Sequence, residues 1–202
     1  MDERRPRPGR VSLMRTAIGL MGEHGYEGTS MRDIAGAAGV SVAALYYHFP
    51  SKLDLLREFL LEAHDVVLGR VERRVEEAGP TARAKLDAAV DGLIWSNIHD
   101  AWARQAALVA WREHGRLALP DQKLVAKKRL QLVEIVQGVL EAGVDDGEFA
   151  TAEPREVARA ILVLCVSVAD PFVEPQPPMA RVIELNQRLA AALADTQAGA
   201  VK

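Results

Sequence analysis

The sequence predicts an all-α protein of about nine helices. Apolar residues recur at helical spacing through most of its 202 residues, and strand-like alternation is scarce. Serine, threonine or aspartate stands directly before several of the apolar runs, where the side chain can cap a helix start. These patterns favour a three-helix N-terminal domain followed by a larger helical bundle.

The expected helices follow one another with short connections. They lie at about 11–23, 30–38, 42–48, 51–77, after Thr81, from Asp100 to before Pro120, and at 121–142, 154–169 and 179–194. Pro154 suits a first helical position, whereas the prolines of 171–178 deny a helix and predict a loop. The expected segments are a basic disordered arm at 1–9, a three-helix domain at 10–50 and a larger helical domain at 51–202, linked by helix 51–77.

The composition is that of an ordinary globular protein, with 49% hydrophobic and 26% charged residues. The longest apolar run, 161–169, is too short to span a membrane. The first ten residues lack the apolar segment of a secretory signal. The single cysteine, Cys165, lies in that apolar run and is expected to be a buried thiol. We therefore expect a cytoplasmic protein without a membrane partner.

Residues 24–52 are the most informative part of the chain. Ser30 and Asp33 have the spacing of a capping box, and Gly39 can end the first short helix in a left-handed conformation. Ser41 can cap the second short helix. Two capped helices joined by a glycine-containing turn are typical of a helix-turn-helix, whose second helix enters the major groove of DNA.

These residues resemble the TetR family of bacterial transcriptional regulators. The resemblance covers about 11–59, through the matching segments 25–30, 32–35, 39–41, 45–49 and 51–52. The rest of the chain is similar in length and helical character. The resemblance implies that 10–50 is a helix-turn-helix DNA-binding domain and that 51–202 is a larger helical, ligand-binding regulatory and dimerisation domain.

The resemblance also implies the DNA-contacting residues. They are Thr29, Ser30, Arg32, Ser41, Val42, Ala43, Ala44, Tyr46, Tyr47, His48 and Lys52. The apolar residues at 42–44 can touch thymine methyl groups but cannot hydrogen-bond a base, so polar readout is expected from Tyr47 more than from Tyr46. Lys52, at a helix start, is the expected main phosphate contact. Arg32 is either a phosphate contact or a solvated charge.

Basic residues crowd the start of the chain at Arg4, Arg5, Arg7, Arg10 and Arg15. A short basic arm before a helix-turn-helix can reach phosphates or the minor groove. The neighbouring acids and prolines equally suit a solvated, disordered tail. Both interpretations stay open at this point.

All three tryptophans fall within the fifth and sixth expected helices. They can simply pack in a core, whereas the resemblance implies an apolar effector pocket between helices. The expected pocket residues are Trp95, His99, Trp102, Leu108, Trp111, Arg112 and Val136. Residues 111–149 resemble regulators of fatty-acid and steroid breakdown that respond to acyl-CoA thioesters, whose phosphates could meet Arg112, Lys127, Lys128 and Arg129.

The last two expected helices carry wide apolar faces, which can form an internal core. The resemblance implies instead a two-fold homodimer held by a four-helix bundle from this pair of helices. The expected interface residues are Ile161, Leu164, Val168, Val182, Leu185 and Leu189.

The leading function is therefore a ligand-responsive repressor that binds a palindromic double-stranded DNA operator. The alternative is a structural or division-control DNA-binding protein of the same fold without a ligand. An enzyme finds little support, because no nucleophile elbow or phosphate-binding glycine loop is present in the sequence. The five histidines are too far apart for a local metal motif, so no metal site and no cofactor are expected.

Overall fold

The computed structural model describes residues 9–169 and 177–196, and within these ranges the chain is entirely helical, as expected. The helices are α1 (Arg10–His24), α2 (Met31–Ala38), α3 (Val42–His48), α4 (Lys52–Glu76), α5 (Ala82–Ile98), α6 (Ala101–Glu113), the short 3-10 helix η1 (His114–Arg116), α7 (Leu119–Asp145), α8 (Pro154–Ser167) and α9 (Met179–Ala194). The expected basic arm and proline loop fall almost wholly outside the described residues.

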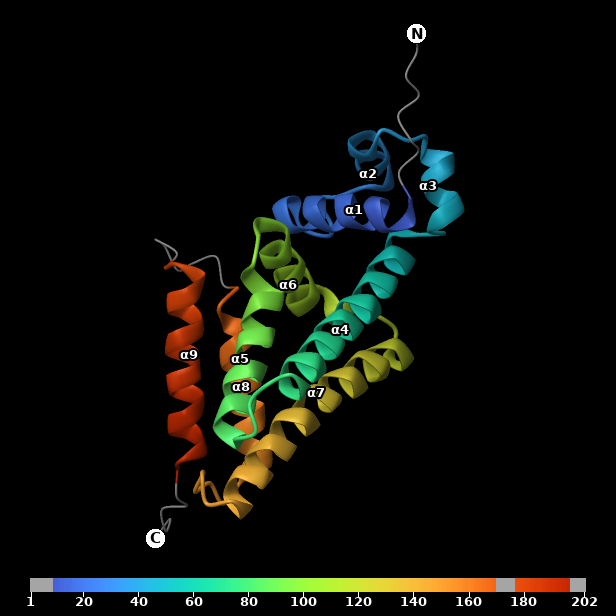
Figure 1. Cartoon of the computed structure of the whole chain (residues 1–202). Helices are drawn as coiled ribbons and strands as arrows, with labels where there is room; N and C mark the ends of the chain where they lie inside the picture. The colour runs from blue at the N-terminus through green and yellow to red at the C-terminus, as the bar shows by residue number, and fades with distance from the viewer. Residues whose placement is uncertain (1–8, 170–176, 197–202) are drawn as a thin grey trace.

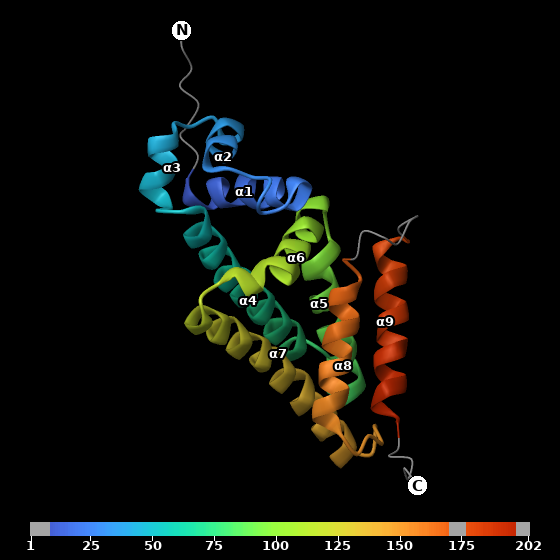
Figure 2. The ribbon, with the colours of Figure 1, turned by 180° about the vertical axis from the view of Figure 1, so that it is seen from behind.

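The three N-terminal helices form a group at one end of the molecule, and α4 runs from this group along the larger bundle (Figure 1). In the bundle, α4 packs against α5 and α7, α5 packs against α9, and α7 packs against α8. Helix α6 lies between the bundle and α1, which it contacts closely (Figure 2). The N-terminal group is therefore joined to the bundle both through α4 and through α6.

A first hydrophobic core, the N-terminal core, fills the space between α1, α2, α3 and the first half of α4. Its largest buried side chains are Leu13, Ile18, Ile34, Leu45, Phe49, Leu55, Leu56 and Leu60. It also contains Ala106 and Val109 of α6, Leu117 directly after η1, and Val125 of α7. This core therefore continues past residue 50, where the sequence places the domain boundary.

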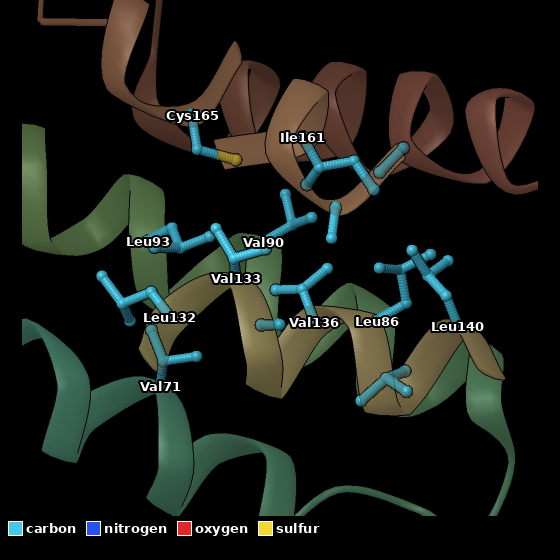
Figure 3. Packing of buried hydrophobic residues seen from close by; sticks show 14 of the residues in the cluster. Val71, Leu86, Val90, Leu93, Leu132, Val133, Val136, Leu140, Ile161 and Cys165 are labelled. Atoms are coloured by element: carbon cyan, nitrogen blue, oxygen red, sulfur yellow. The ribbon is translucent and has the colours of Figure 1, made fainter. Parts of the chain in front are cut away.

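A second core, the C-terminal core, is built from α5, α7 and α8 together with Val71 of α4 and small residues of α9. Figure 3 shows Val90 and Val133 facing Ile161 and Cys165 across this core. Val136 and Ile161 are both completely enclosed in it. Ile161 therefore has no free surface for the dimer interface to which the sequence assigns it, whereas the assignment of Val136 to a ligand pocket stays a prediction.

Cys165 is buried in the C-terminal core, as the sequence predicts. Burial raises the pKa of its thiol to about 12. A thiolate is the reactive form of cysteine, so this residue is an apolar packing element and not a redox centre.

Helix α7 shows where local sequence signals mislead. It begins at Leu119, before the proline that was expected to separate two helices. Pro120 is tolerated because the first turn of a helix needs no backbone donor. Helices α4 and α7 contain 25 and 27 residues. Even so, none of the described helices combines the length and apolar character needed to cross a membrane.

The caps expected from the sequence are present at three helices of the bundle. The side chains of Ser51, Thr81 and Asp100 accept hydrogen bonds from the backbone amides of the third residues of α4, α5 and α6. The α5 start has an additional, long-range cap, because the Glu148 carboxylate accepts from the amides of Ala82 and Arg83 at 3.0 Å each. This contact fixes the α7–α8 turn against α5.

Two glycines of α7 give a matched test of this packing. A Cβ at Gly143 would lie 2.1 Å from Cδ2 of the buried Phe149 ring and 2.9 Å from Cβ of Ala82, whereas a Cβ at Gly138 would meet nothing within 4 Å. Gly143→Ala should therefore lower the free energy of unfolding by about 1–3 kcal/mol. Gly138→Ala should raise it by about 0.5–1 kcal/mol, since alanine favours helix. Urea unfolding of both variants measures this, and equal effects would contradict the packing described.

Candidate nucleic-acid interface and its regulatory connections

The α2–turn–α3 unit forms as its sequence predicts. The Ser30 hydroxyl accepts from the Asp33 amide while the Asp33 carboxylate accepts from the Ser30 amide, which completes the capping box. Gly39 has φ 67°, a left-handed conformation that glycine adopts without steric cost. Ser41 accepts from the Ala44 amide and starts α3. These local bonds set the angle between the two helices.

Helix α3 has one buried face and one open face. Leu45 and the following Phe49 are fully buried in the N-terminal core. Ala43, Ala44 and Tyr46 lie on the open face, and Tyr47 projects furthest, with 87% of its surface exposed. Val42 and His48 are half-buried at its edges. The open face therefore presents methyl groups and two phenol rings, a chemistry suited to thymine methyls and base edges.

Lys52 is used inside the domain. Its Nζ donates to the carbonyl oxygens of Tyr26 at 2.6 Å and Thr29 at 2.8 Å, and lies 4.0 Å from the centre of the Tyr26 ring. The interpretation of Lys52 as the main phosphate contact is therefore corrected, because two of its three N–H donors already hold the loop before α2. Lys52 is a brace that fixes α2 relative to α4.

Thr29 is too buried to contact DNA as the sequence predicts, whereas Arg32 is exposed and free to do so. Thr29 is 1% exposed, and its hydroxyl donates to the Gly25 carbonyl at 2.9 Å. The hydroxyls of Ser30 and Ser41 are exposed but are engaged in capping. Arg32 is exposed at the start of α2. Among the side chains expected to contact phosphate, Arg32 is therefore the charge best placed to do so.

Arg10 holds the C-terminal end of α3, a role that local sequence patterns could not reveal. Its guanidinium pairs with Glu58 of α4, donates to the His48 carbonyl at 2.7 Å and lies 4.6 Å from the centre of the Phe49 ring. The pairing lowers the pKa of the Glu58 carboxyl. Its partners lie 38 and 48 residues away in sequence, so no spacing rule points to them.

Helix α6 forms a second connection between the N-terminal helices and the bundle. The Trp102 indole donates to the Arg15 carbonyl at 3.1 Å, and the Arg15 guanidinium lies 4.4 Å from the centre of the indole ring. Gly22 lets Gln105 approach closely, because a Cβ there would lie 2.8 Å from that of Gln105. Trp102 therefore belongs to the contact between α1 and α6, which corrects its assignment to the ligand pocket.

Trp95 lies in a stack of three planar groups. Its ring is parallel to the His99 ring at 3.7 Å between centres, and the Arg70 guanidinium of α4 lies 3.8 Å from its centre. The Nε of Arg70 is buried without a hydrogen-bond partner among the described residues. Burial, and then the neighbouring Arg74 and Arg73, lower the pKa of Arg70. The stack places an unsatisfied donor between α4 and α5.

The remaining residues of the expected pocket do not share one cavity. Leu108 is half-buried against the C-terminal core, Arg112 is exposed, and Trp111 is 54% exposed. A hollow of about 300 Å³ lies instead against the first turns of α7, lined by His114, Leu119, Gln122, Lys123, Val125, Ala126 and Arg129. None of the seven residues expected from the sequence lines it. In the described part of the chain no group of three or more His, Cys, Asp or Glu side chains is arranged to hold a metal ion.

Comparison with known proteins identifies the family. Residues 13–59 match the model of bacterial regulatory proteins of the tetR family, and residues 79–172 match that of the tetracyclin repressor-like C-terminal domain. The HTH-type transcriptional repressor KstR2 of Rhodococcus jostii is 31% identical over 151 residues, which cover 74% of this chain and 72% of that protein. The chain belongs to the TetR family.

Two solved structures of regulators share this fold over most of the chain. AibR in complex with isovaleryl coenzyme A and operator DNA matches with a TM-score of 0.78 and 20% identity, over 89% of this chain and 96% of that one. FadR from Bacillus subtilis in complex with stearoyl-CoA matches with a TM-score of 0.75 and 20% identity, over 91% and 98%. As a member of the TetR family, the protein is a DNA-binding transcriptional regulator and not an enzyme.

The last two helices of this TetR-family chain are only partly covered by the rest of it. Val168 and Val182 pack partly against the C-terminal core, and Leu164 is half-buried. Leu185 and Leu189 of α9 are 46% and 42% exposed, and Val163 of α8 is 59% exposed. The exposed large apolar side chains of these two helices are therefore Val163, Leu185 and Leu189, and they do not include Ile161.

The two roles of Lys52 and Tyr47 can be separated by experiment. Lys52→Met should lower the free energy of unfolding by about 1–3 kcal/mol, since it removes the ammonium donor to the Thr29 carbonyl and one of the two donors to the Tyr26 carbonyl. Tyr47→Ala should leave unfolding unchanged and weaken operator binding by about 1–3 kcal/mol. Thermal unfolding and operator titrations at several salt concentrations measure both. A Lys52 variant that unfolds normally but loses about one phosphate contact from its salt slope would restore the phosphate role.

Proposed function

We propose that this protein is a homodimeric, cytoplasmic repressor that leaves a near-palindromic operator when an acyl-CoA thioester binds to its regulatory bundle. The observation that carries the proposal is the double connection of the DNA-reading helices to the bundle, through α4 and through the α1–α6 contact. Support for the effector class comes from the similar regulators named with stearoyl-CoA and isovaleryl coenzyme A, and support for repression from the relative KstR2.

The proposed DNA-reading surface is the open face of α3. Ala43, Ala44, Tyr46 and Tyr47 would meet the bases, with Val42 and His48 at the edges and Ser30, Ser41 and Arg32 beside the phosphates. A face this poor in hydrogen-bonding groups favours a site rich in thymine methyls and readout of DNA shape. Two such faces must lie about one helical turn of DNA apart, which requires a two-fold partner.

The proposed site for the acyl part lies between α4, α5 and α6. Trp95, His99 and Leu108 supply its aromatic and apolar surface, while Trp111 and Arg112 lie toward the exposed end of α6. The buried Arg70 Nε offers a donor to a thioester carbonyl. An acceptor there would remove the cost of an unsatisfied buried donor, about 1–3 kcal/mol. Since Arg70 belongs to α4, the acyl group would bind directly to the helix that reaches the DNA-reading unit.

The proposed dimer uses the exposed apolar surface of α8 and α9. Leu189→Glu should place a charge in this surface and yield monomers, because an unpaired carboxylate cannot be buried at an interface. Val66→Glu is the matched control, since Val66 is similarly exposed on α4. Sedimentation at micromolar concentration should report a dimer for wild type and for the control. A wild-type monomer would contradict the proposal.

Effector and operator should weaken each other by the same factor, because their coupling is reciprocal. A factor of about 5–150 is typical. Operator titrations with and without stearoyl-CoA or a steroid acyl-CoA, and effector titrations with and without operator, measure it. Trp102→Ala should reduce the factor while leaving effector affinity intact, and Trp102→Phe, which keeps a ring over Arg15, should lie in between. If no acyl-CoA changes operator affinity, the effector class is wrong.

A further inference from the structure

The hollow against α7 is lined by basic and apolar groups. Lys123 and Arg129 lie about 1.7 turns apart on α7, and His114 of η1 lines the same hollow. No carboxylate is among its seven lining residues, and Val125, Leu119 and Ala126 supply the apolar part. Cations beside an apolar surface, without lining acids, favour an anionic group attached to an apolar or neutral chain.

Arg129 differs from the other cations nearby in its choice of partner. Lys128 pairs with Asp65, Arg57 pairs with Asp121 at 2.8 Å, and Arg116 pairs with Glu113. Arg129 is half-buried, and its Nε donates to Nε2 of His64 at 3.2 Å, with no ion pair in the described ranges. Burial lowers the pKa of its guanidinium. A neutral imidazole is a weak partner for a guanidinium, so an anion can replace it.

Loss of the Arg129 bond to His64 would act directly on α4, because His64 belongs to this helix. Its Nδ1 lies 2.6 Å from the Leu60 carbonyl, which assigns the ring proton to Nδ1 and leaves Nε2 as the acceptor for Arg129. Burial lowers the pKa of His64, so the neutral ring that this bond needs is the favoured form. Leu60 is a fully buried member of the N-terminal core. The Arg129–His64 bond therefore connects the hollow to the middle of α4, one turn after Leu60 of the N-terminal core.

We propose that Lys123 and Arg129 bind a phosphate of coenzyme A in this hollow, and that Arg129 exchanges its bond to His64 for one to the phosphate. The exchange would remove one of the polar bonds between α7 and α4, with the Arg57–Asp121 and Lys128–Asp65 pairs left in place, and so favour the form of α4 that leaves the operator. This inference rests on the proposed acyl-CoA response and adds to it the site and the release step. Of the basic residues of α7, Lys127 and Lys128 are not expected to bind the phosphate, because Lys128 is paired with Asp65 and Lys127 does not line the hollow.

The binding step is tested with coenzyme A itself on the full chain. Arg129→Gln and Lys123→Gln should each weaken coenzyme A binding by about tenfold or more, as the loss of a charged hydrogen bond does. Lys127→Gln, on the same helix and exposed, is the matched control and should bind as wild type. Isothermal titration measures all four proteins. Equal affinity of wild type and Arg129→Gln for coenzyme A would overturn the site. In a competition experiment, inorganic pyrophosphate should displace bound coenzyme A; displacement by a free fatty acid but not by pyrophosphate would also overturn the site.

The release step is tested at His64. His64→Leu removes the acceptor and should bind coenzyme A as tightly as wild type or tighter, while its operator affinity without effector falls toward that of the effector-bound wild type. His64→Gln, which keeps an acceptor, should restore the wild-type operator affinity. A His64→Leu protein that responds to acyl-CoA as wild type does would overturn the exchange.

The two proposals fail separately. If acyl-CoA releases the operator equally well from wild type and Arg129→Gln, the repressor proposal stands and the hollow is not its phosphate site. If coenzyme A binds in an Arg129-dependent manner but no acyl-CoA affects the operator, the phosphate site stands, and both the acyl-CoA response and the release step built on it are overturned.

Discussion

The structure depends on one helix being shared between two hydrophobic cores. The first half of α4 supplies Leu55, Leu56, Phe59 and Leu60 to the N-terminal core, and Val71 belongs to the C-terminal core. Packed interiors do not deform continuously, because interlocked side chains permit only discrete arrangements. A displacement of α4 in the bundle must therefore be met by a rearrangement at the DNA-reading helices or by a break within α4. The α1–α6 contact limits which rearrangement is available.

Cations on aromatic faces mark most of these connections. Arg10 lies over Phe49, Lys52 over Tyr26 and Arg15 over Trp102, each where one helix meets another group of helices. Such contacts contribute about 0.5–1 kcal/mol when exposed and about 2 kcal/mol when desolvated. They are weak enough to be exchanged and geometrically specific enough to fix an orientation. Much of the basic charge of the N-terminal helices thus holds the domain together and is not free to bind phosphate.

The sequence predicts this fold well wherever the signal is local. Ser30, Asp33, Gly39 and Ser41 act within a few residues of their own positions, so the bounds of α2 and α3 follow from them. Side-chain roles that depend on distant partners are not predictable in this way. Lys52 looks like a phosphate ligand until the Tyr26 and Thr29 carbonyls are seen beside it.

The same limit applies to the regulatory half. Trp102 resembles a pocket residue until Arg15 is found 87 residues away, and Val136 and Ile161 lie in apolar stripes that give no sign of which side is covered. The sequence also gives no sign of the roles proposed for Arg70, Lys123 and His64. Each is an ordinary charged or polar residue on a helix surface in sequence, and only tertiary packing makes it unusual.

The extension of the N-terminal core into α6 and α7 has a consequence for building hybrid regulators. A chimera joined at residue 50 would separate the α1–α3 part of the N-terminal core from the apolar surface formed by Ala106, Val109, Leu117 and Val125. The regulatory bundle of another protein would then not supply the apolar side chains that complete this core. Residues 1–50 therefore cannot be moved to another regulator as a complete folding unit. To transfer operator specificity, the exposed residues of α3 should be grafted onto the recipient's own N-terminal domain.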